Sequence, residues 1–189
     1  MRKVHPQGFE NHEKGSTFKI MSYNLLSDEN LKKNGTHLLS DDPCLEPMYR
    51  YRRILAEIEQ ANADIICLQE VSLKTAYPFF AKELIAMGYH VITLKKQEGI
   101  EMTATEKQEA EKQKLSHPRY WEILTAFKKG KFELLEKEEV DFFRVNLDYL
   151  NHNPEDFKRS NKGMLLLLQS VSNPTDKLVL ANTQLYLGD

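Results

Sequence analysis

Residues 20–26 read Ile20-Met21-Ser22-Tyr23-Asn24-Leu25-Leu26, and residues 64–71 read Asp64-Ile65-Ile66-Cys67-Leu68-Gln69-Glu70-Val71. The apolar runs in these stretches predict two buried strands, over 18–26 and 64–68. Asn24 and Glu70 would then lie at two strand ends, on the rim of a sheet. An amide oxygen and a carboxylate suit Mg²⁺, which takes oxygen ligands and uses only one or two protein carboxylates. We therefore expect Asn24 and Glu70 to hold one divalent metal ion, Mg²⁺ or Mn²⁺.

Strands and helices alternate on either side of these stretches. Apolar residues spaced i, i+3, i+4 and i+7 predict an amphipathic helix that contains Tyr51, Ile54, Leu55 and Ile58. A second helix is predicted over 75–87, where Gly88 stops it, and a third strand over 89–94. The stretch 27–47 is rich in Asp, Asn and Gly and is expected to be a loop. This order of elements is typical of an α/β layered domain.

The second half of the chain predicts more strands. Residues 120–127 and 132–140 indicate two strands around a turn at 128–130, and 164–169 with 177–183 indicate a hairpin whose turn is 173–176. The last strand, over 178–187, is expected to lack partners and leave an open edge. Residues 97–115 carry many charges and almost no large apolar side chain, which favours an exposed insertion. Residues 1–17 are polar and are expected to form a flexible leader.

Length and composition limit the classes of protein. The 189 residues suit one domain, with 41% hydrophobic and 29% charged residues. Lys plus Arg number 26 against 28 Asp plus Glu, so the chain has no global positive field for nucleic acid. The basic clusters at 50–53, 95–96, 128–131 and 158–162 are interpreted as solvated surface. Two cysteines and the lack of an apolar run of about 20 residues indicate a cytoplasmic or nuclear protein without a membrane span.

The quoted strings resemble a known group of proteins. Together with Tyr51-Arg52-Arg53-Ile54, with Asn161 and Gly163 before a Leu run, and with Ala181-Asn182-Thr183, they resemble the endonuclease/exonuclease/phosphatase superfamily. Within it, they are similar to the deadenylase branch that includes nocturnin and the Angel proteins. The resemblance spans about residues 18–189 and is specific over the first 94 positions. It implies an α/β, four-layer fold in which helices flank a β-sandwich of two mixed sheets, with this chain forming the N-terminal half to two-thirds.

The resemblance also implies a chemistry. The family hydrolyses phosphodiesters with Mg²⁺, which activates water for in-line attack without a covalent enzyme intermediate. The implied activity is a 3′-to-5′ exoribonuclease on single-stranded RNA, with poly(A) as the substrate by analogy. Glu70 matches the metal-binding carboxylate, and Asn24 matches the asparagine that holds the metal or the phosphate. Asn182 matches a phosphate-side contact, and Asn161 and Gln184 match residues of the substrate groove.

The sequence departs from the family pattern in three places. The family motif Asn-Thr-His reads Asn182-Thr183-Gln184, and a glutamine donates a hydrogen bond without charge or proton exchange. The family segment Asp-Gly-Cys-Ala reads Glu-Ile-Leu-Thr at 122–125. The Asp-x-Asn motif and the Asp-His pair, which in the family position and deprotonate the attacking water, are not found before Asp189. We therefore expect these 189 residues alone to be catalytically silent.

Two alternatives stay open on these departures. The chain could be a non-catalytic binding or regulatory remnant that engages a partner through the half-fold or through residues 97–115. It could also be a superfamily phosphatase that acts on a phosphoinositide or another small phosphodiester. A pull-down that survives Glu70→Ala, together with no effect of Mg²⁺ on thermal stability, would favour the remnant.

Overall fold

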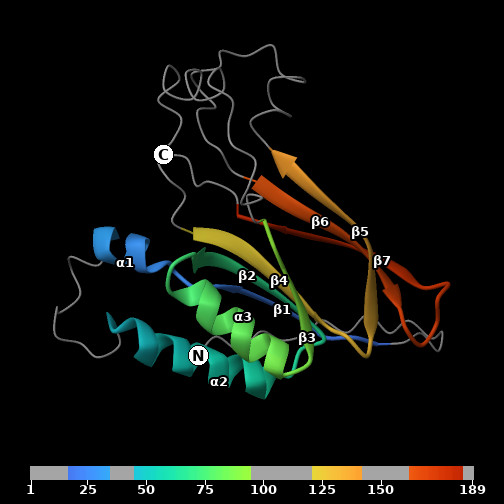
Figure 1. Cartoon of the computed structure of the whole chain (residues 1–189), viewed down its shortest axis with the longest axis horizontal. Helices are drawn as coiled ribbons and strands as arrows, with labels where there is room; N and C mark the ends of the chain where they lie inside the picture. The colour runs from blue at the N-terminus through green and yellow to red at the C-terminus, as the bar shows by residue number, and fades with distance from the viewer. Residues whose placement is uncertain (1–16, 35–44, 95–120, 142–161, 185–189) are drawn as a thin grey trace, which may run out of the picture.

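The computed structural model describes residues 17–34, 45–94, 121–141 and 162–184 (Figure 1). The predictions for residues 1–16, for the charged segment 97–115 and for Asn161 lie outside these ranges, and the predicted domain boundaries stay predictions. The described elements are β1 (Ile20–Asn24), α1 (Asp28–Asn34), α2 (Pro47–Ala61), β2 (Ile65–Ser72), α3 (Ala76–Ala86), β3 (Tyr89–Thr93), β4 (Trp121–Lys128), β5 (Phe132–Asp141), β6 (Lys162–Ser170) and β7 (Lys177–Thr183).

The strands form two sheets that pack face to face. In the first sheet the order is β1-β2-β4-β3, with β1 and β2 parallel and β4 antiparallel to both of its neighbours. In the second sheet the order is β5-β6-β7, antiparallel throughout the described strands. Helices α2 and α3 cover the outer face of the first sheet (Figure 1). The predicted α/β sandwich with flanking helices is confirmed for the part of the fold that the structure describes.

Strand β2 lies at the centre and has a buried face on each side. Ile66 and Leu68 pack against the helix layer, while Ile65 and Cys67 pack against the second sheet. A strand buried on both faces reads as a continuous apolar run, which is how this one appears in the sequence. Burial raises the pKa of the Cys67 thiol to about 11, although Thr125 bonds to it. The expected inert, buried thiol is therefore present at position 67.

Both amphipathic helices occur where the apolar spacing predicts them. Helix α2 buries Tyr51, Ile54 and Ile58 against the first sheet, and α3 buries Phe80 and Leu84 beside them. Among the helices that the structure describes, none is long and apolar enough to cross a membrane.

The turn at 128–130 joins two sheets rather than two paired strands. Both strands around it are confirmed, but β4 pairs with β2 and β3, while β5 pairs with β6. Because both edges of β4 are already occupied, the chain crosses into the other sheet after Lys128. Asp64 holds this crossing through ion pairs with Lys128 at 3.1 Å and Lys131 at 2.9 Å. Burial favours a raised pKa for Asp64, but hydrogen bonds from Lys131, the Lys19 backbone N–H and Lys128 outweigh it and lower the pKa to about 2.

The predicted loop at 27–47 contains helix α1. Ser27 begins this helix, since its Oγ accepts a hydrogen bond from the Asn30 backbone N–H at 3.1 Å. Asp28 and Glu29 follow in the first turn, where negative charge favours a helix. The helix has no apolar stripe, so hydrophobic spacing does not detect it. The prediction of a loop over this whole stretch is wrong at 28–34.

The hairpin of β6 and β7 is confirmed, with its turn closed by the Asp176 N–H, which donates to the Asn173 carbonyl at 2.9 Å. Strand β7 pairs with β6 from Lys177 to Thr183. The pairing with β6 is the predicted hairpin, and among the described strands β7 is the edge of its sheet, so the expectation that it lacks further partners stays a prediction.

Candidate active site

Glu70 lies within β2 at a β-bulge. Gln69 and Glu70 together occupy the place opposite Ile123 of β4, where the register shifts between Leu68 and Val71. Strand β2 therefore continues to Ser72, and the prediction that it ends at 68 is wrong because the bulge interrupts the apolar pattern without ending the pairing. Glu70 has a φ of 54°, a left-handed conformation that costs a residue with a side chain roughly 1 kcal/mol or more.

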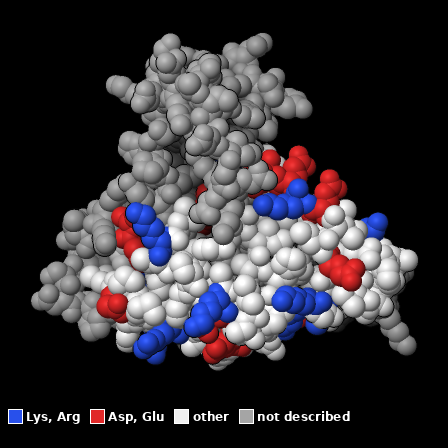
Figure 2. Space-filling model, viewed as in Figure 1, with Lys and Arg blue, Asp and Glu red and all other residues white. Residues whose placement is uncertain are grey.

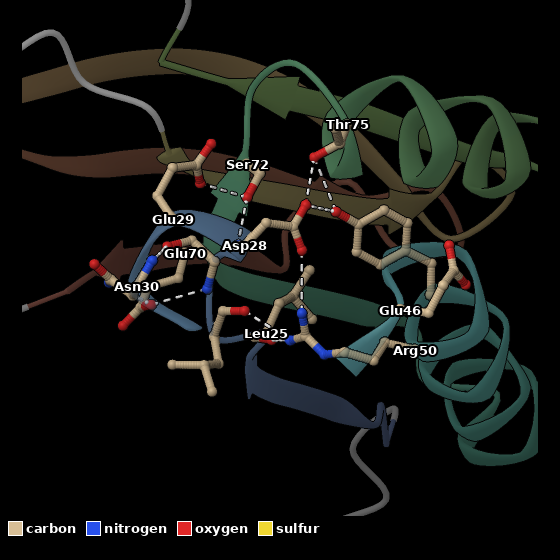
Figure 3. Close-up of polar contacts among 12 residues, drawn as sticks. Leu25, Asp28, Glu29, Asn30, Glu46, Arg50, Glu70, Ser72 and Thr75 are labelled. Carbon is tan, nitrogen blue, oxygen red and sulfur yellow. Dashed lines mark hydrogen bonds and ion pairs between the residues drawn. The ribbon is translucent and has the colours of Figure 1, made fainter. Parts of the chain in front are cut away.

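The Glu70 carboxylate is buried and accepts four hydrogen bonds. Its Oε1 accepts from Asn24 Nδ2 at 3.1 Å and from Gln184 Nε2 at 2.7 Å. Its Oε2 accepts from the Ser27 backbone N–H at 3.0 Å and from Asn30 Nδ2 at 2.7 Å. Figure 3 shows Asn30 beside this carboxylate. The structure thus brings together Asn24, Glu70 and Gln184, three of the residues named from sequence, from β1, β2 and the end of β7.

All four donors to Glu70 are neutral. Burial by itself favours a raised pKa for Glu70, but the hydrogen bonds from Asn30, Ser27, Asn24 and Gln184 outweigh it, so the pKa lies below its ordinary value. The group is therefore an anion at neutral pH. Within the described ranges no Lys, Arg or His forms an ion pair with it. The four hydrogen bonds stabilise this buried charge, and a bound cation would stabilise it further.

The donor set fits a magnesium ion in part. Glu70 supplies a charged oxygen, and Gln184, which donates to it, has a buried Oε1 without a hydrogen-bond partner among the described residues. The Oδ1 of Asn24 accepts from the Leu26 backbone N–H at 2.8 Å while its Nδ2 donates to Glu70, so the Asn24 side chain orients Glu70 in this arrangement, and its role as a metal ligand stays a prediction. Among the described residues, no group of three or more His, Cys, Asp or Glu side chains is placed so that it could hold a metal ion. One carboxylate is within the usual range for Mg²⁺, which keeps several water ligands.

Asn182 lies beneath this site, between the two sheets, and is 3% exposed. Its Nδ2 donates to the Leu124 carbonyl at 3.1 Å and to Thr125 Oγ1 at 3.0 Å, and lies 3.4 Å from the Leu68 carbonyl. Its Oδ1 accepts from Gln69 Nε2 at 2.9 Å. These bonds join β7 to β2 and β4. A phosphate contact by Asn182 stays a prediction, and its bonds favour a role in holding the sheets together.

Sequence analysis missed a second polar cluster next to Glu70, formed around Asp28 of α1 (Figure 3). Asp28 forms an ion pair with Arg50 of α2 at 3.1 Å and accepts hydrogen bonds from Tyr51 and, at 2.6 Å, from Thr75. The Asp28 backbone N–H donates to Ser72 Oγ at 2.9 Å. The only sequence signal was the run of arginines at 50–53, which we interpreted as solvated surface. That interpretation is wrong for Arg50, because its helix face turns toward α1.

The remaining charges do not form a single-sign patch on the face seen in Figure 2. Lys and Arg alternate there with Asp and Glu over the described part of the chain. The clusters at 95–96 and 158–162 lie wholly or mostly outside the described residues, and Lys128 and Lys131 form ion pairs with Asp64. The rim around Glu70 therefore remains the candidate site.

The chain is similar in sequence to several known proteins. The chain is 31% identical over 186 residues to protein angel homolog 2 of Bos taurus, covering 93% of this chain and 28% of that protein. It is 25% identical over 189 residues to the CCR4-Not complex 3′-5′-exoribonuclease subunit Ccr4 of Candida albicans, covering 97% of this chain and 22% of that protein. The chain thus spans about a quarter of the length of these relatives. No family model matches it.

Solved structures agree with these relatives. The crystal structure of ANGEL2, a 2′,3′-cyclic phosphatase, in complex with adenosine-2′,3′-vanadate has a TM-score of 0.66 and 29% identity, covering 89% of this chain and 41% of that one. The endonuclease/exonuclease/phosphatase from Bacteroides vulgatus has a TM-score of 0.52 at 16% identity, covering 88% and 51%, and shows the same fold.

Proposed function

Because this chain belongs to the endonuclease/exonuclease/phosphatase superfamily, we propose that it contributes the metal-binding half of a Mg²⁺-dependent site that hydrolyses phosphodiesters of RNA. The observation that supports this proposal best is the buried, ionised Glu70 with four neutral donors and no counter-charge in the described part of the chain. The Oε1 of Gln184, which is buried and has no hydrogen-bond partner in the part of the chain that the structure describes, is a second oxygen near this carboxylate.

In this proposal each residue has a defined task. Glu70 holds the ion directly, and Asn24, Asn30 and the Ser27 N–H keep its carboxylate in one orientation. Gln184 donates to Glu70 and presents its free oxygen beside it. A divalent ion at such a site offsets charge on phosphoryl oxygens and lowers the pKa of a bound water. The residues that would deprotonate that water are not among those described.

The finer proposal concerns the substrate. The similarity to Ccr4, which is a 3′-5′-exoribonuclease, supports an RNA 3′ end as the substrate. Poly(A) is the first candidate for it, by the resemblance of the sequence to the deadenylase branch. The TM-score of 0.66 to ANGEL2, a 2′,3′-cyclic phosphatase, supports a second candidate, the 2′,3′-cyclic phosphate at an RNA 3′ end. Both candidates place a phosphodiester of RNA at the Glu70 rim, and both suit a cytoplasmic or nuclear protein.

Metal-dependent stability tests the proposal. Mg²⁺ and Mn²⁺ are titrated into the purified chain, and thermal unfolding is followed by circular dichroism. A ligand at one hundred times its Kd stabilises a protein by about 2.7 kcal/mol, which is a readily measured rise in Tm. Glu70→Gln keeps the size of the side chain and removes its charge, so the rise is expected to disappear. The matched control is Glu57→Gln on the exposed face of α2, which keeps the full rise.

Four outcomes would overturn the proposal or one of the expectations attached to it. An unchanged Tm of the wild-type chain with either metal, or an equal rise in Glu70→Gln, would refute the metal site and favour the non-catalytic remnant. Labelled oligo(A) and an oligonucleotide with a 2′,3′-cyclic phosphate end are then incubated with the chain. Glu70-dependent release of AMP from the first would overturn the expectation that these 189 residues are silent, and turnover of only the second would refute the poly(A) substrate.

A further inference from the structure

We propose that Arg50 is a positioning residue for the Glu70 carboxylate, acting through the turn that joins β1 to α1. This inference rests on the proposed function, in which Glu70 holds the metal ion. Arg50 lies on α2 and does not bond to Glu70 itself. It bonds to the backbone segment from which three of the four donors to Glu70 come.

The Arg50 side chain holds the turn between β1 and α1 through three hydrogen bonds. Its Nη2 donates to the Leu25 carbonyl at 2.6 Å and to the Leu26 carbonyl at 2.7 Å. Its Nη1 donates to Asp28 Oδ1 at 3.1 Å. One planar guanidinium therefore fixes three successive parts of the turn, which a lysine ammonium cannot match in geometry. The Arg50 side chain is 13% exposed, so water does not readily replace these bonds.

These bonds maintain an unfavourable backbone conformation at Leu26. Leu26 has a φ of 54°, a left-handed conformation that its side chain disfavours. Such a conformation persists where neighbouring contacts fix it. The Arg50 bonds to the Leu25 and Leu26 carbonyls, which belong to the peptide units before and after Leu26, supply that constraint. The residues before and after this turn are Asn24 and Ser27.

The turn in this conformation directs three hydrogen-bond donors at the Glu70 carboxylate. Asn24 Nδ2 and the Ser27 N–H donate to opposite oxygens of the carboxylate, and Asn30 donates from the first turn of α1. Asp28 anchors the start of the same helix, through Arg50 on its side chain and Ser72 on its backbone. Without Arg50 the turn can relax, and the donors lose their common direction toward Glu70. Arg50 thereby controls how well the carboxylate is oriented for a metal ion.

Manganese affinity tests the inference, with free Mn²⁺ measured by electron paramagnetic resonance. Residues that orient a metal ligand typically contribute 10- to 100-fold to metal affinity, so Arg50→Met is expected to bind Mn²⁺ at least about 10-fold more weakly than wild type. Arg50→Lys keeps the charge without the planar fork and is expected to restore affinity only in part. Arg52→Met is the matched control on the exposed face of the same helix, where the expected affinity equals that of wild type.

A second control separates positioning from general stability. Asp64 is as buried as Asp28 and forms ion pairs too, but it precedes β2 at the end away from Glu70. Asp64→Asn is expected to lower Tm and leave the Mn²⁺ affinity unchanged, whereas Asp28→Asn is expected to lower both. Equal losses of Mn²⁺ affinity in Asp64→Asn and Arg50→Met would overturn the inference, because both would then act through the stability of the fold.

Hydrogen exchange of the Ser27 amide gives a readout that needs no metal. This amide donates to Glu70, so its exchange by NMR is expected to be at least about 10-fold faster in Arg50→Met, and slower again in Arg50→Lys, while the amides of β6 stay protected. Unchanged Ser27 exchange in Arg50→Met would overturn the positioning role. If wild type binds no Mn²⁺, the proposed function fails, and the exchange of Ser27 alone decides whether Arg50 orients the turn.

Discussion

Replacing Asn182 with alanine tests whether this residue joins the two sheets. The side chain is 3% exposed and has three well-formed hydrogen bonds, to the Leu124 carbonyl, Thr125 Oγ1 and Gln69 Nε2. Each is worth about 1 kcal/mol net, and a buried partner left unbonded costs more. Gln69 Nε2 also donates to the Cys67 carbonyl at 3.2 Å, so it keeps a hydrogen bond in the variant, and losing the bond to Asn182 costs less there than at Leu124 or Thr125. We expect Asn182→Ala to lower the free energy of unfolding by about 2–3 kcal/mol.

Urea unfolding followed by circular dichroism measures this change. With a slope of roughly 2 kcal/mol per molar urea, the midpoint is expected to fall by roughly 1 M. The control is Thr183→Ala at the next residue of β7, whose Oγ1 donates one long hydrogen bond, of 3.3 Å, to the Lys162 carbonyl. It is expected to change stability by less than about 1 kcal/mol. A loss within about 0.5 kcal/mol for Asn182→Ala would refute the sheet-joining role and favour the phosphate contact expected from sequence.

Three further predictions concern groups in the core and near its edges. Cys67, whose pKa is about 11, is expected to resist iodoacetamide at pH 8 in the native chain and to react in urea, as measured by mass spectrometry of its peptide. Asp64 has a folded-state pKa of about 2, below its ordinary 3.8, so its contribution to stability is complete above pH 4 and is lost as pH falls toward 2. In Asp64→Asn, the urea midpoint is expected to depend less on pH between pH 4 and 2 than in the wild type. An equal dependence on pH in both proteins would contradict this. Tyr51→Phe removes the hydroxyl that donates to Asp28 and lies 2.9 Å from Thr75, and is expected to lower the free energy of unfolding by about 1–2 kcal/mol in the same urea assay.

Hydrophobic periodicity predicted the elements whose burial depends on it. The helices around Ile58 and Leu84, the central strand through Ile66 and the β6–β7 hairpin all carry apolar patterns that match their faces in the fold. Periodicity does not specify which strands pair. For that reason the strands on either side of Gly130 were predicted correctly as strands, while their separation into two sheets was not.

The polar elements around the site were harder to predict. Helix α1 is stabilised by its Ser27 cap and by its contacts with α2 and Ser72, and none of these produces an apolar stripe. Arg50 lies in a run of similar arginines, and only the three-dimensional fold distinguishes it from exposed Arg52. The meeting of Asn24 with Glu70 could be predicted, because Asn24 at the end of β1 lies in register with Gln69 of the neighbouring parallel strand β2. The burial of Asn182 could not, because it depends on how the two sheets stack.

The bulge at Glu70 has a consequence for protein engineering. In a regular strand, residues three apart face opposite sides, whereas Leu68 and Val71, on either side of Glu70, both pack in the core beneath the helices because the bulge adds one residue. Transplanting this site onto another sheet therefore requires the extra backbone unit together with the side chain. Removing one codon between Leu68 and Val71 would restore regular pairing and rotate the carboxylate away from the rim, so even a shortened but well-folded chain would lose its acid.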